Sequence, residues 1–574
     1  MNDKKLHTKR RQYTSRFYKR NRFLYFVMLL SAMLMSCLNL AFSWLQQQII
    51  DTVSGVPESL KIHVLTVLTI GIALLIIPFK ALTYVSLPRF IKKAMMQFKR
   101  FAFQKLMQKN IASFRNESTS VYLSAFSNDL TSIEINYLEK QYMIVFNIVW
   151  AAGAMILMLA YSPTLTLVAV GFFILPIIAS MITGVHLEKA EKAVSEKNAD
   201  FVASLKDILS GFSIIKSFRA EGAAMNILEQ SNTSVENAKC KKRKITIILS
   251  AIGGMAGITA QLGTFLIGAV LALSGLSITP GVLMVFIQLT AAVISPVQEL
   301  PELIANRKAA SALIDKMILA MESNIRDEGR DIPNHLNNGI SVHHLSFGYE
   351  PGNEILHNID INFETGKSYA IVGNSGSGKS TLLNLLMASH HDYEGTIRYD
   401  DSELREINSE SLYELVSMIE QNVFVFDASI RDNITMFRNF PTAEVDKAIE
   451  LSGLSQLIER HGADYLCGEN GRGLSGGEKQ RISIARSLLQ KSSVLLADEV
   501  TAALDAQTAY QVTNDILKLG GTTRIVVTHA LVESLLRQYD GIIVLKDGYI
   551  IENGTFEDLM KQKGYFYALY TVAQ

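Results

Sequence analysis

Residues 373–380 read Gly-Asn-Ser-Gly-Ser-Gly-Lys-Ser. They follow the apolar run Ser-Tyr-Ala-Ile-Val at 368–372 and precede Thr-Leu-Leu-Asn-Leu-Leu-Met at 381–387, which predicts a strand, a glycine-rich loop and a helix in succession. Glycines let backbone N–H groups turn toward a phosphate, and the start of a helix adds positive potential. A plain turn is the alternative, but the Lys-Ser ending favours a phosphate-binding loop. The predicted nucleotide ligands here are Gly373, Asn374, Ser375, Gly376, Ser377, Gly378, Lys379, Ser380 and Thr381.

Two acids follow a second apolar run, because residues 494–499 read Val-Leu-Leu-Ala-Asp-Glu. This pattern predicts a buried strand whose carboxyl end lies beside the phosphate loop. Taken alone, the acids would more often be a solvated strand end. Together with the loop they predict an ATP site in which Lys379 contacts the β- and γ-phosphates and Ser380 and Asp498 hold Mg²⁺. Glu499 is then placed to polarise the water that attacks the γ-phosphate.

A third motif, Leu-Ser-Gly-Gly-Glu at 474–478, precedes a helical run at 479–486. It offers a small hydroxyl and unobstructed backbone amides at a helix start, which is a second place for an anion to bind. Ser475, Gly476 and Gly477 are the predicted phosphate contacts. One chain therefore carries two phosphate-binding surfaces.

The N-terminal half has the composition of a membrane domain. The 574-residue chain is 49% hydrophobic with a mean hydropathy of +0.20, which is high for a wholly soluble protein. A bilayer core needs about 20 apolar helical residues. Six stretches meet this length, at roughly 23–45, 62–84, 140–161, 164–184, 246–273 and 279–300. The sequence therefore predicts six membrane spans.

The segments between these spans differ in length and charge. The long ones, 85–139 and 185–245, are rich in Lys and Arg, whereas the short ones at 46–61, 162–163 and 274–278 contain almost none. The positive-inside rule places the long segments and both termini in the cytoplasm. Their alternation of charged and apolar residues predicts helices that continue beyond the membrane.

Four parts follow from these patterns. They are a basic cytoplasmic N-terminal arm at 1–22, a six-span α-helical domain at 23–322, a linker at 323–338, and an α/β P-loop nucleotide-binding domain at 339–574.

The chain holds 55 basic and 54 acidic residues, so its charge predicts no nucleic-acid partner. Cys37, Cys240 and Cys467 are too far apart for a disulfide framework or a zinc site.

Several polar residues fall inside the predicted spans, where they are costly unless they face a partner or a cavity. They are substrate-site candidates only, and for Lys80 reaching the membrane interface is the favoured alternative. The set is Asn39, Lys80, Asn147, Gln261, Gln288 and Gln298.

The order of these motifs resembles the ATP-binding cassette (ABC) superfamily, whose signature is Leu-Ser-Gly-Gly-Gln. Glu478 stands here in place of the final Gln. Six spans followed by one cassette resemble an exporter half-transporter of the multidrug, peptide or lipid type, and the resemblance covers essentially the whole chain.

The resemblance implies roles for five further residues. Tyr349 matches the aromatic residue that stacks on adenine, and Gln421 matches the loop glutamine that contacts Mg²⁺ and faces the membrane domain. Asp505 matches the loop that crosses to the opposite subunit. His529 matches the switch histidine that contacts the γ-phosphate and orients the catalytic water. Glu469 resembles an exporter loop acid, although a solvated loop charge is the favoured alternative.

The family also implies an assembly. Two chains would pair head to tail, as a homodimer or as a heterodimer with another half-transporter, and sandwich two ATP molecules between Lys379 of one chain and Ser475 of the other. The turns near 113–120 and 218–221 resemble coupling helices, with ordinary helical corners as an equal alternative. We expect an integral protein of a bacterial cytoplasmic membrane that exports a peptide, drug-like molecule or lipid. The alternative is a membrane-anchored regulatory or sensing ATPase without transport.

Overall fold

The computed structural model describes residues 3–573 except 58, 116, 118, 275–277, 323–328, 351 and 502. The chain divides into two units, Met1–Met107 with Thr119–Ser323, and Gln108–Ser118 with Asn324–Gln574. The first part of the predicted linker, 323–328, lies outside the described residues. Residues 108–118, which the sequence places in the membrane domain, belong to the second unit.

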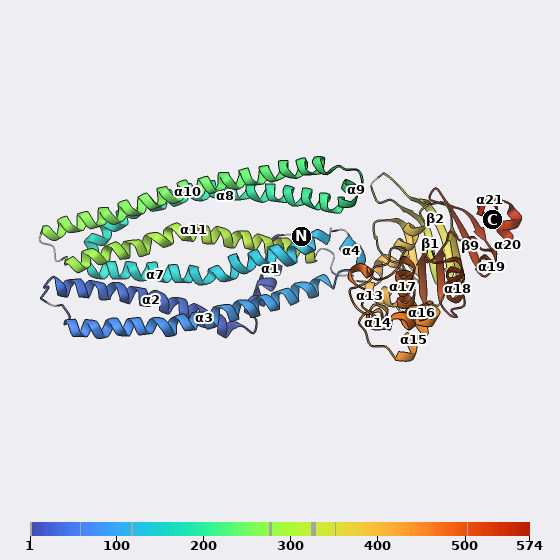
Figure 1. Cartoon of the computed structure of the whole chain (residues 1–574), viewed down its shortest axis with the longest axis horizontal. Helices are drawn as coiled ribbons and strands as arrows, with labels where there is room; N and C mark the ends of the chain where they lie inside the picture. The colour runs from blue at the N-terminus through green and yellow to red at the C-terminus, as the bar shows by residue number, and fades with distance from the viewer. Residues whose placement is uncertain are drawn as a thin grey trace. The chain divides into compact units, whose positions relative to one another are not determined.

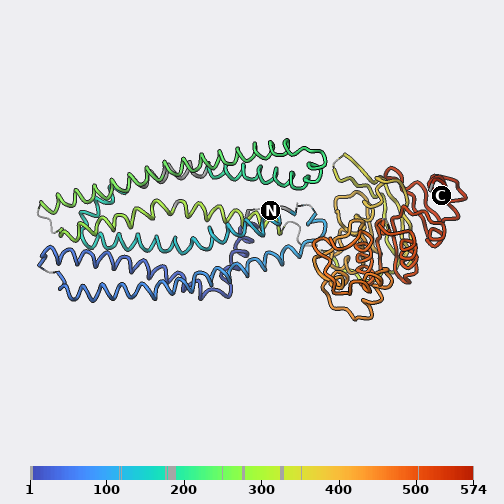
Figure 2. Tube along the Cα trace, viewed as in Figure 1, coloured from blue at the N-terminus to red at the C-terminus, as the bar shows by residue number. Residues whose placement is uncertain are grey.

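The first unit is entirely helical in its described residues (Figures 1 and 2). Long helices run side by side in it: α8 lies along α10, α2 along α3, and α7 against α2 and α11. Two π-helical turns, η1 and η2, interrupt the approach to α7. The elements are α1 (Asp3–Tyr18), α2 (Arg22–Val53), α3 (Ile62–Leu106), α5 (Thr119–Ser124), η1 (Ala125–Asp129), α6 (Leu130–Ile133), η2 (Glu134–Glu139), α7 (Lys140–Tyr161), α8 (Pro163–Ser210), α9 (Phe212–Ser217), α10 (Glu221–Leu273) and α11 (Pro280–Glu322).

Five stretches in the described residues are long and apolar enough to cross a membrane: Arg22–Val53, Ile62–Leu106, Val121–Tyr161, Glu221–Leu273 and Pro280–Glu322. The apolar stretch of α8 with described side chains, Pro163–Ile174, is shorter. The α7–α8 turn is sharp because Ser162 accepts a hydrogen bond from the Leu165 N–H at 3.3 Å and Pro163 occupies the first turn of α8. The helical membrane domain is confirmed, and the count of six spans stays a prediction.

The basic N-terminal arm forms a packed helix. Tyr13 and Phe17 on α1 are fully buried, and both rings pack on Phe98 of α3. Arg10 Nε also donates to Asp315 of α11 at 2.6 Å. The buried aromatic rings of α1 therefore pack this helix against the other helices of the first unit.

The second unit contains two sheets. A four-stranded antiparallel sheet has the order β2-β1-β4-β5, and a six-stranded sheet has the order β10-β9-β3-β8-β7-β6. Neighbours from β9 to β6 pair in parallel, and β10 closes the edge antiparallel. The strands are β1 (Gly339–Phe347), β2 (Leu356–Glu364), β3 (Ser368–Val372), β4 (Glu394–Tyr399), β5 (Ser402–Glu403), β6 (Val416–Ile419), β7 (Val494–Asp498), β8 (Thr523–Val527), β9 (Gly541–Lys546) and β10 (Tyr549–Gly554).

Helices surround these sheets and complete the α/β architecture that the sequence predicted. The central strands β3, β7 and β8 are buried along their whole length, as expected for parallel strands covered on both faces. The helical elements are α4 (Ile111–Arg115), α12 (Lys379–Leu386), η3 (Leu404–Glu406), α13 (Ser409–Leu415), α14 (Ile430–Thr435), α15 (Thr442–Leu451), α16 (Ser455–His461), η4 (Glu469–Gly471), α17 (Gly476–Gln490), α18 (Ala506–Leu517), α19 (Glu533–Leu536), α20 (Phe556–Gln562) and α21 (Tyr565–Ala573).

Candidate active site

Four neighbouring parallel strands supply the predicted site. The phosphate loop follows β3, His529 follows β8, Glu499 follows β7 and Gln421 follows β6. Because these strands are adjacent and parallel, their carboxyl ends lie at one edge of the sheet. Residues that are far apart in the chain therefore meet at this edge.

The phosphate loop is shaped by glycines. Gly373, Gly376 and Gly378 have φ angles of 154°, 82° and 98°, which other residues rarely adopt. A Cβ at Gly373 would lie 2.1 Å from the Leu545 carbonyl oxygen, so a side chain does not fit there. The Ser377 Oγ is buried without a hydrogen-bond partner among the described residues, as suits a group that awaits a phosphate oxygen.

Lys379 crosses this loop from the first turn of α12. Its side chain is buried, and Nζ donates to the carbonyl oxygens of Gly373 at 2.9 Å and Asn374 at 2.8 Å. Burial lowers the pKa of Lys379, although the carboxylates of Glu499 and Asp498 oppose this effect. The ammonium group of Lys379 is therefore held inside the loop, in a position to contact a bound phosphate.

Ser380 and Asp498 form the predicted metal pair. The Ser380 Oγ donates to Asp498 Oδ1 at 3.0 Å. Burial raises the pKa of Asp498, the hydrogen bond from Ser380 opposes this, and the charge of Glu499 adds to it. Among the described residues no group of three or more His, Cys, Asp or Glu side chains could hold a metal alone. The pair fits Mg²⁺, which prefers oxygen ligands and is usually held by one or two carboxylates with substrate phosphates.

Glu499 is held on both sides. Gln421 Nε2 donates to one carboxylate oxygen at 2.6 Å, and His529 Nε2 donates to the other at 2.7 Å. The backbone of Glu499 has φ 48°, and its N–H donates to the Val527 carbonyl at 3.2 Å. The structure thus brings together Glu499, which the sequence pattern predicted as the catalytic base, and Gln421 and His529, which the family resemblance placed at the Mg²⁺ ion and the γ-phosphate.

Ser475, Gly476 and Gly477 lie at the start of α17. Ser475 Oγ and N–H donate to Glu478 Oε2 at 2.9 and 2.7 Å, and the Glu478 N–H donates back to Ser475 Oγ at 3.3 Å, which is a capping box. Within the described part of one chain no hydrogen bond joins 475–477 to the loop 373–380. Gly477 packs closely against the backbone of Ala503, since a Cβ at Gly477 would lie 2.9 Å from the Ala503 carbonyl oxygen.

Among the described residues, Tyr349 and Asp505 form no hydrogen bond with the Glu499 carboxylate. Tyr349 is half exposed, with its hydroxyl 3.4 Å from Thr381 Oγ1 and its ring against Phe347 and His390. An exposed aromatic ring beside the phosphate loop suits stacking on a base. Asp505 caps α18 by accepting from the Thr508 N–H at 2.9 Å, which is a structural task in the single chain.

Sequence reasoning missed two contacts of this site. Gln480 Nε2 lies 3.5 Å from the Glu499 carbonyl oxygen. Arg115 of α4 donates to Asn384 at 3.1 Å and to Glu420 at 3.4 Å, one residue before Gln421. Nothing in the local sequence around Glu420 indicated that Arg115, 305 residues away, is its partner.

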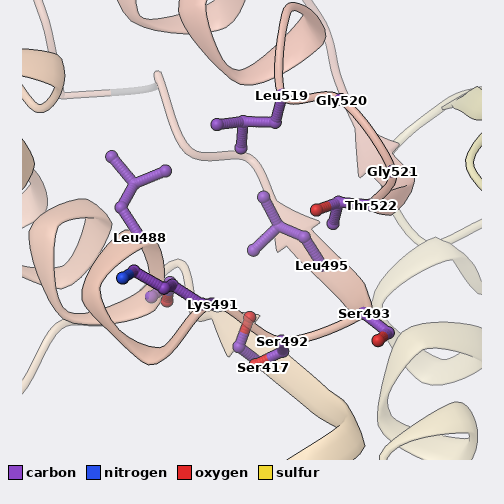
Figure 3. Close-up of a pocket in the computed structure, with 11 residues that line it drawn as sticks. Ser417, Leu488, Lys491, Ser492, Ser493, Leu495, Leu519, Gly520, Gly521 and Thr522 are labelled. Atoms are coloured by element: carbon purple, nitrogen blue, oxygen red, sulfur yellow. The ribbon is translucent and has the colours of Figure 1, made fainter. Parts of the chain in front are cut away.

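A cavity of about 380 Å³ lies elsewhere in the second unit (Figure 3). Ser417, Leu495 and Thr522 line it, at the amino ends of β6, β7 and β8. It is therefore at the opposite edge of the sheet from Glu499. None of the predicted site residues lines this cavity.

Fold and site together define a P-loop ATPase domain on a chain with a helical membrane domain. Residues 25–297 match the family model for the ABC transporter transmembrane region, and residues 356–502 match the family model described as ABC transporter. The chain belongs to the ABC transporter family. It is an integral membrane protein with the half-transporter exporter architecture, and an ATP-hydrolysing transporter.

Relatives agree with this assignment. An ATP-dependent lipid A-core flippase of Yersinia pestis is 28% identical over 489 residues, which cover 83% of this chain and 82% of that protein. The uncharacterized ABC transporter ATP-binding protein YwjA of Bacillus subtilis is 28% identical over 481 residues, 82% of each. A solved structure of a bacterial Atm1-family ABC exporter with ATP bound has a TM-score of 0.82 at 22% identity, covering 96% of this chain and 98% of that chain.

Proposed function

We propose that this chain exports a peptide, drug-like molecule or lipid across the bacterial cytoplasmic membrane by alternating access, as a dimer with two ATP sites between the cassettes. The observation that carries the proposal is the position of Glu499, whose carboxylate is held by Gln421 and His529 beside the phosphate loop. The signature segment 475–477 is joined to its own residue 478 and not to this loop. A second chain would complete each site.

The residues of one chain would divide the work of ATP binding. The loop amides, Lys379 and Ser377 would hold the phosphates, and Tyr349 would lie against the adenine. Ser380, Asp498 and Gln421 would hold Mg²⁺, which would neutralise charge on the phosphates. Ser475, Gly476 and Gly477 of the partner would contact the γ-phosphate, and Asp505 would reach across the interface.

Glu499 would act as the general base. An in-line attack needs a water whose proton is accepted within hydrogen-bond distance. Its carboxylate oxygens now accept from Gln421 and His529, so both partners must shift when the water is bound. His529 would then orient that water and contact the γ-phosphate. The carboxylate would change partners without leaving its strand end.

The membrane arrangement follows from charge. The long polar segments carry the Lys and Arg residues, which supports a cytoplasmic location for them, for both termini and for the ATPase domain. The relative from Yersinia pestis is a lipid A-core flippase, and this supports an amphipathic substrate here.

Reconstituted protein tests the proposal. Glu499→Gln should reduce ATP hydrolysis at least 100-fold while ATP still binds, because the amide keeps the shape of the carboxylate but accepts no proton. Hydrolysis and ATP binding would be measured in proteoliposomes, with ATP-driven uptake of labelled lipid, peptide and drug probes into inside-out vesicles. Normal hydrolysis by this variant would remove Glu499 from catalysis. Hydrolysis without uptake of any probe would favour a regulatory ATPase.

A further inference from the structure

A polar cluster joins three helices of the first unit. Glu299 of α11 accepts hydrogen bonds from Asn147 Nδ2 of α7 and from Ser295 Oγ of its own helix, each at 3.0 Å. The adjacent Gln298 donates to the Gly253 carbonyl of α10 at 2.7 Å. Asn147 and Gln298 were substrate-site candidates from the sequence, whereas Glu299 was not.

The cluster lies within the apolar parts of these helices. A helix rises about 1.5 Å per residue, so Glu299 is roughly 28 Å from the start of α11 and Gly253 roughly 30 Å from the end of α10. A hydrocarbon core is about 30 Å thick. Both residues therefore fall near the end of the core from which α10 and α11 continue as polar extensions, the side assigned to the cytoplasm.

Glu299 has no positively charged partner among the described residues, since its hydrogen bonds come from an amide and a hydroxyl. Arg307, two turns further along α11, lies over the Tyr137 ring at 5.0 Å. Asn147 is 4% exposed, whereas Glu299 is exposed. The Glu299 carboxylate thus accepts a hydrogen bond from the buried Asn147 and is otherwise exposed.

An unpaired carboxylate facing lipid is costly, and acids in membrane helices usually face a cavity, a partner or a transported ion. An apolar contact adjoins the polar cluster: Ile294, one turn earlier on α11, is buried, and a Cβ at Gly257 of α10 would lie 3.5 Å from its Cγ2. A carboxylate next to an apolar surface is complementary to a molecule with a positive group and a hydrophobic body.

We propose that Glu299, positioned by Asn147 and Ser295, binds the cationic group of the transported substrate, which is an amphipathic organic cation. This inference rests on the proposed export function and names the substrate class. Binding requires no ATP, so the site and the transport function are tested separately.

Two hydrophobic ions of nearly equal size and opposite charge provide the probe. Full-length protein in detergent should bind tetraphenylphosphonium saturably and bind tetraphenylborate at least tenfold more weakly. Glu299→Gln should weaken tetraphenylphosphonium binding at least tenfold, because an amide cannot neutralise the cation. Glu302→Gln, which removes an exposed carboxylate one turn away on α11, is the matched control and should bind as the unaltered protein does.

Charge reversal guards against a folding defect. Glu299→Lys should exchange the preference so that tetraphenylborate binds more tightly, which an unfolded variant would not do. Absence of saturable tetraphenylphosphonium binding, or equal loss in Glu299→Gln and Glu302→Gln, would overturn the proposal. Glu299-dependent binding without ATP-driven uptake of the cation into inside-out vesicles would keep the site and refute the export function.

Discussion

At the scale of single residues, the site depends on backbone positions that only certain residues tolerate. Glu499 adopts φ 48° and Gly373 adopts φ 154° at the ends of β7 and β3. A non-glycine residue with positive φ is uncommon and is found repeatedly at functional sites. The strain at Glu499 turns its carboxylate toward Gln421 and His529, which hold it there.

Gly373→Ala should abolish high-affinity ATP binding. Its Cβ would lie 2.1 Å from the Leu545 carbonyl oxygen, so the loop or β9 must move. Gly366→Ala is the control, because Gly366 also has a positive φ, of 75°, but a Cβ there meets nothing within 4 Å. The control should cost about 1 kcal/mol of stability and leave ATP binding intact. Equal ATP affinity of the two variants, measured by equilibrium titration, would contradict the role of the loop.

Glu478→Gln should lower the KM for ATP about fivefold. The Glu478 carboxylate accepts a hydrogen bond from the Ser475 hydroxyl. A neutral amide oxygen accepts a weaker hydrogen bond than a carboxylate does, so the Ser475 hydroxyl would be freer to bind a phosphate. The substitution should have no such effect in a Ser475→Ala background, so a double-mutant cycle in steady-state ATP hydrolysis isolates the interaction. An unchanged KM in the single variant would contradict it.

The same pair predicts how this effect depends on pH. Burial acts to raise the pKa of Glu478, but hydrogen bonds from the Ser475 backbone and hydroxyl outweigh it and lower the pKa. The carboxylate therefore stays ionised through the pH range in which a free glutamate becomes protonated, and it is protonated only in stronger acid. The KM ratio between the unaltered protein and Glu478→Gln should be constant from about pH 6 to about pH 8.5. A ratio that falls toward 1 near pH 6 would show a raised pKa instead.

At the scale of elements, the short helix α4 contacts the chain around β6, the strand that Gln421 follows. The Ile111 N–H donates to the Tyr413 hydroxyl at 3.0 Å, and Arg115 pairs with Glu420 at 3.4 Å. Both charged side chains are about half exposed, so the pair contributes little to stability, about 0–1 kcal/mol. Because Glu420 directly precedes Gln421 in the chain, we expect this pair to help position Gln421.

Arg115→Glu should lower the rate of ATP hydrolysis a few-fold without a change in melting temperature, because like charges would push α4 from the strand end. Glu420→Arg should do the same. The double exchange, Arg115→Glu with Glu420→Arg, should recover most of the rate by restoring the attraction. Hydrolysis in lipid nanodiscs measures this, and additive losses in the double variant would exclude the charge pair as the cause.

At the scale of the whole molecule, the proposed ATP site between two chains predicts which mixed dimers are active. Each site would join Lys379 of one chain to the signature of the other. A dimer with Lys379→Ala in one chain and Gly477→Asp in the other keeps one intact site. A dimer with both substitutions in the same chain keeps none.

Differently tagged chains would be co-expressed, purified through both tags and assayed for nucleotide trapped with vanadate. The first dimer should trap about one nucleotide and the second none. Equal trapping by both arrangements would contradict the sandwich. Failure of the two tagged copies to co-purify would point to a heterodimer with a different half-transporter.

The sequence by itself determined the motifs, their order, the apolar helices and the α/β pattern, because each depends on neighbouring residues: glycines for a tight loop, periodicity for helices, buried runs for strands. It also indicated Glu499 from the strand-end pattern, and the resemblance to the family indicated Gln421 and His529. Only the tertiary structure brought these three into hydrogen-bond contact, since the strand order β3-β8-β7-β6 is not the chain order. The same holds for Arg115 with Glu420 and for Asn147 with Glu299, which are separated by 305 and 152 residues. Pairing across such distances depends on how whole elements pack, and local sequence carries no record of it.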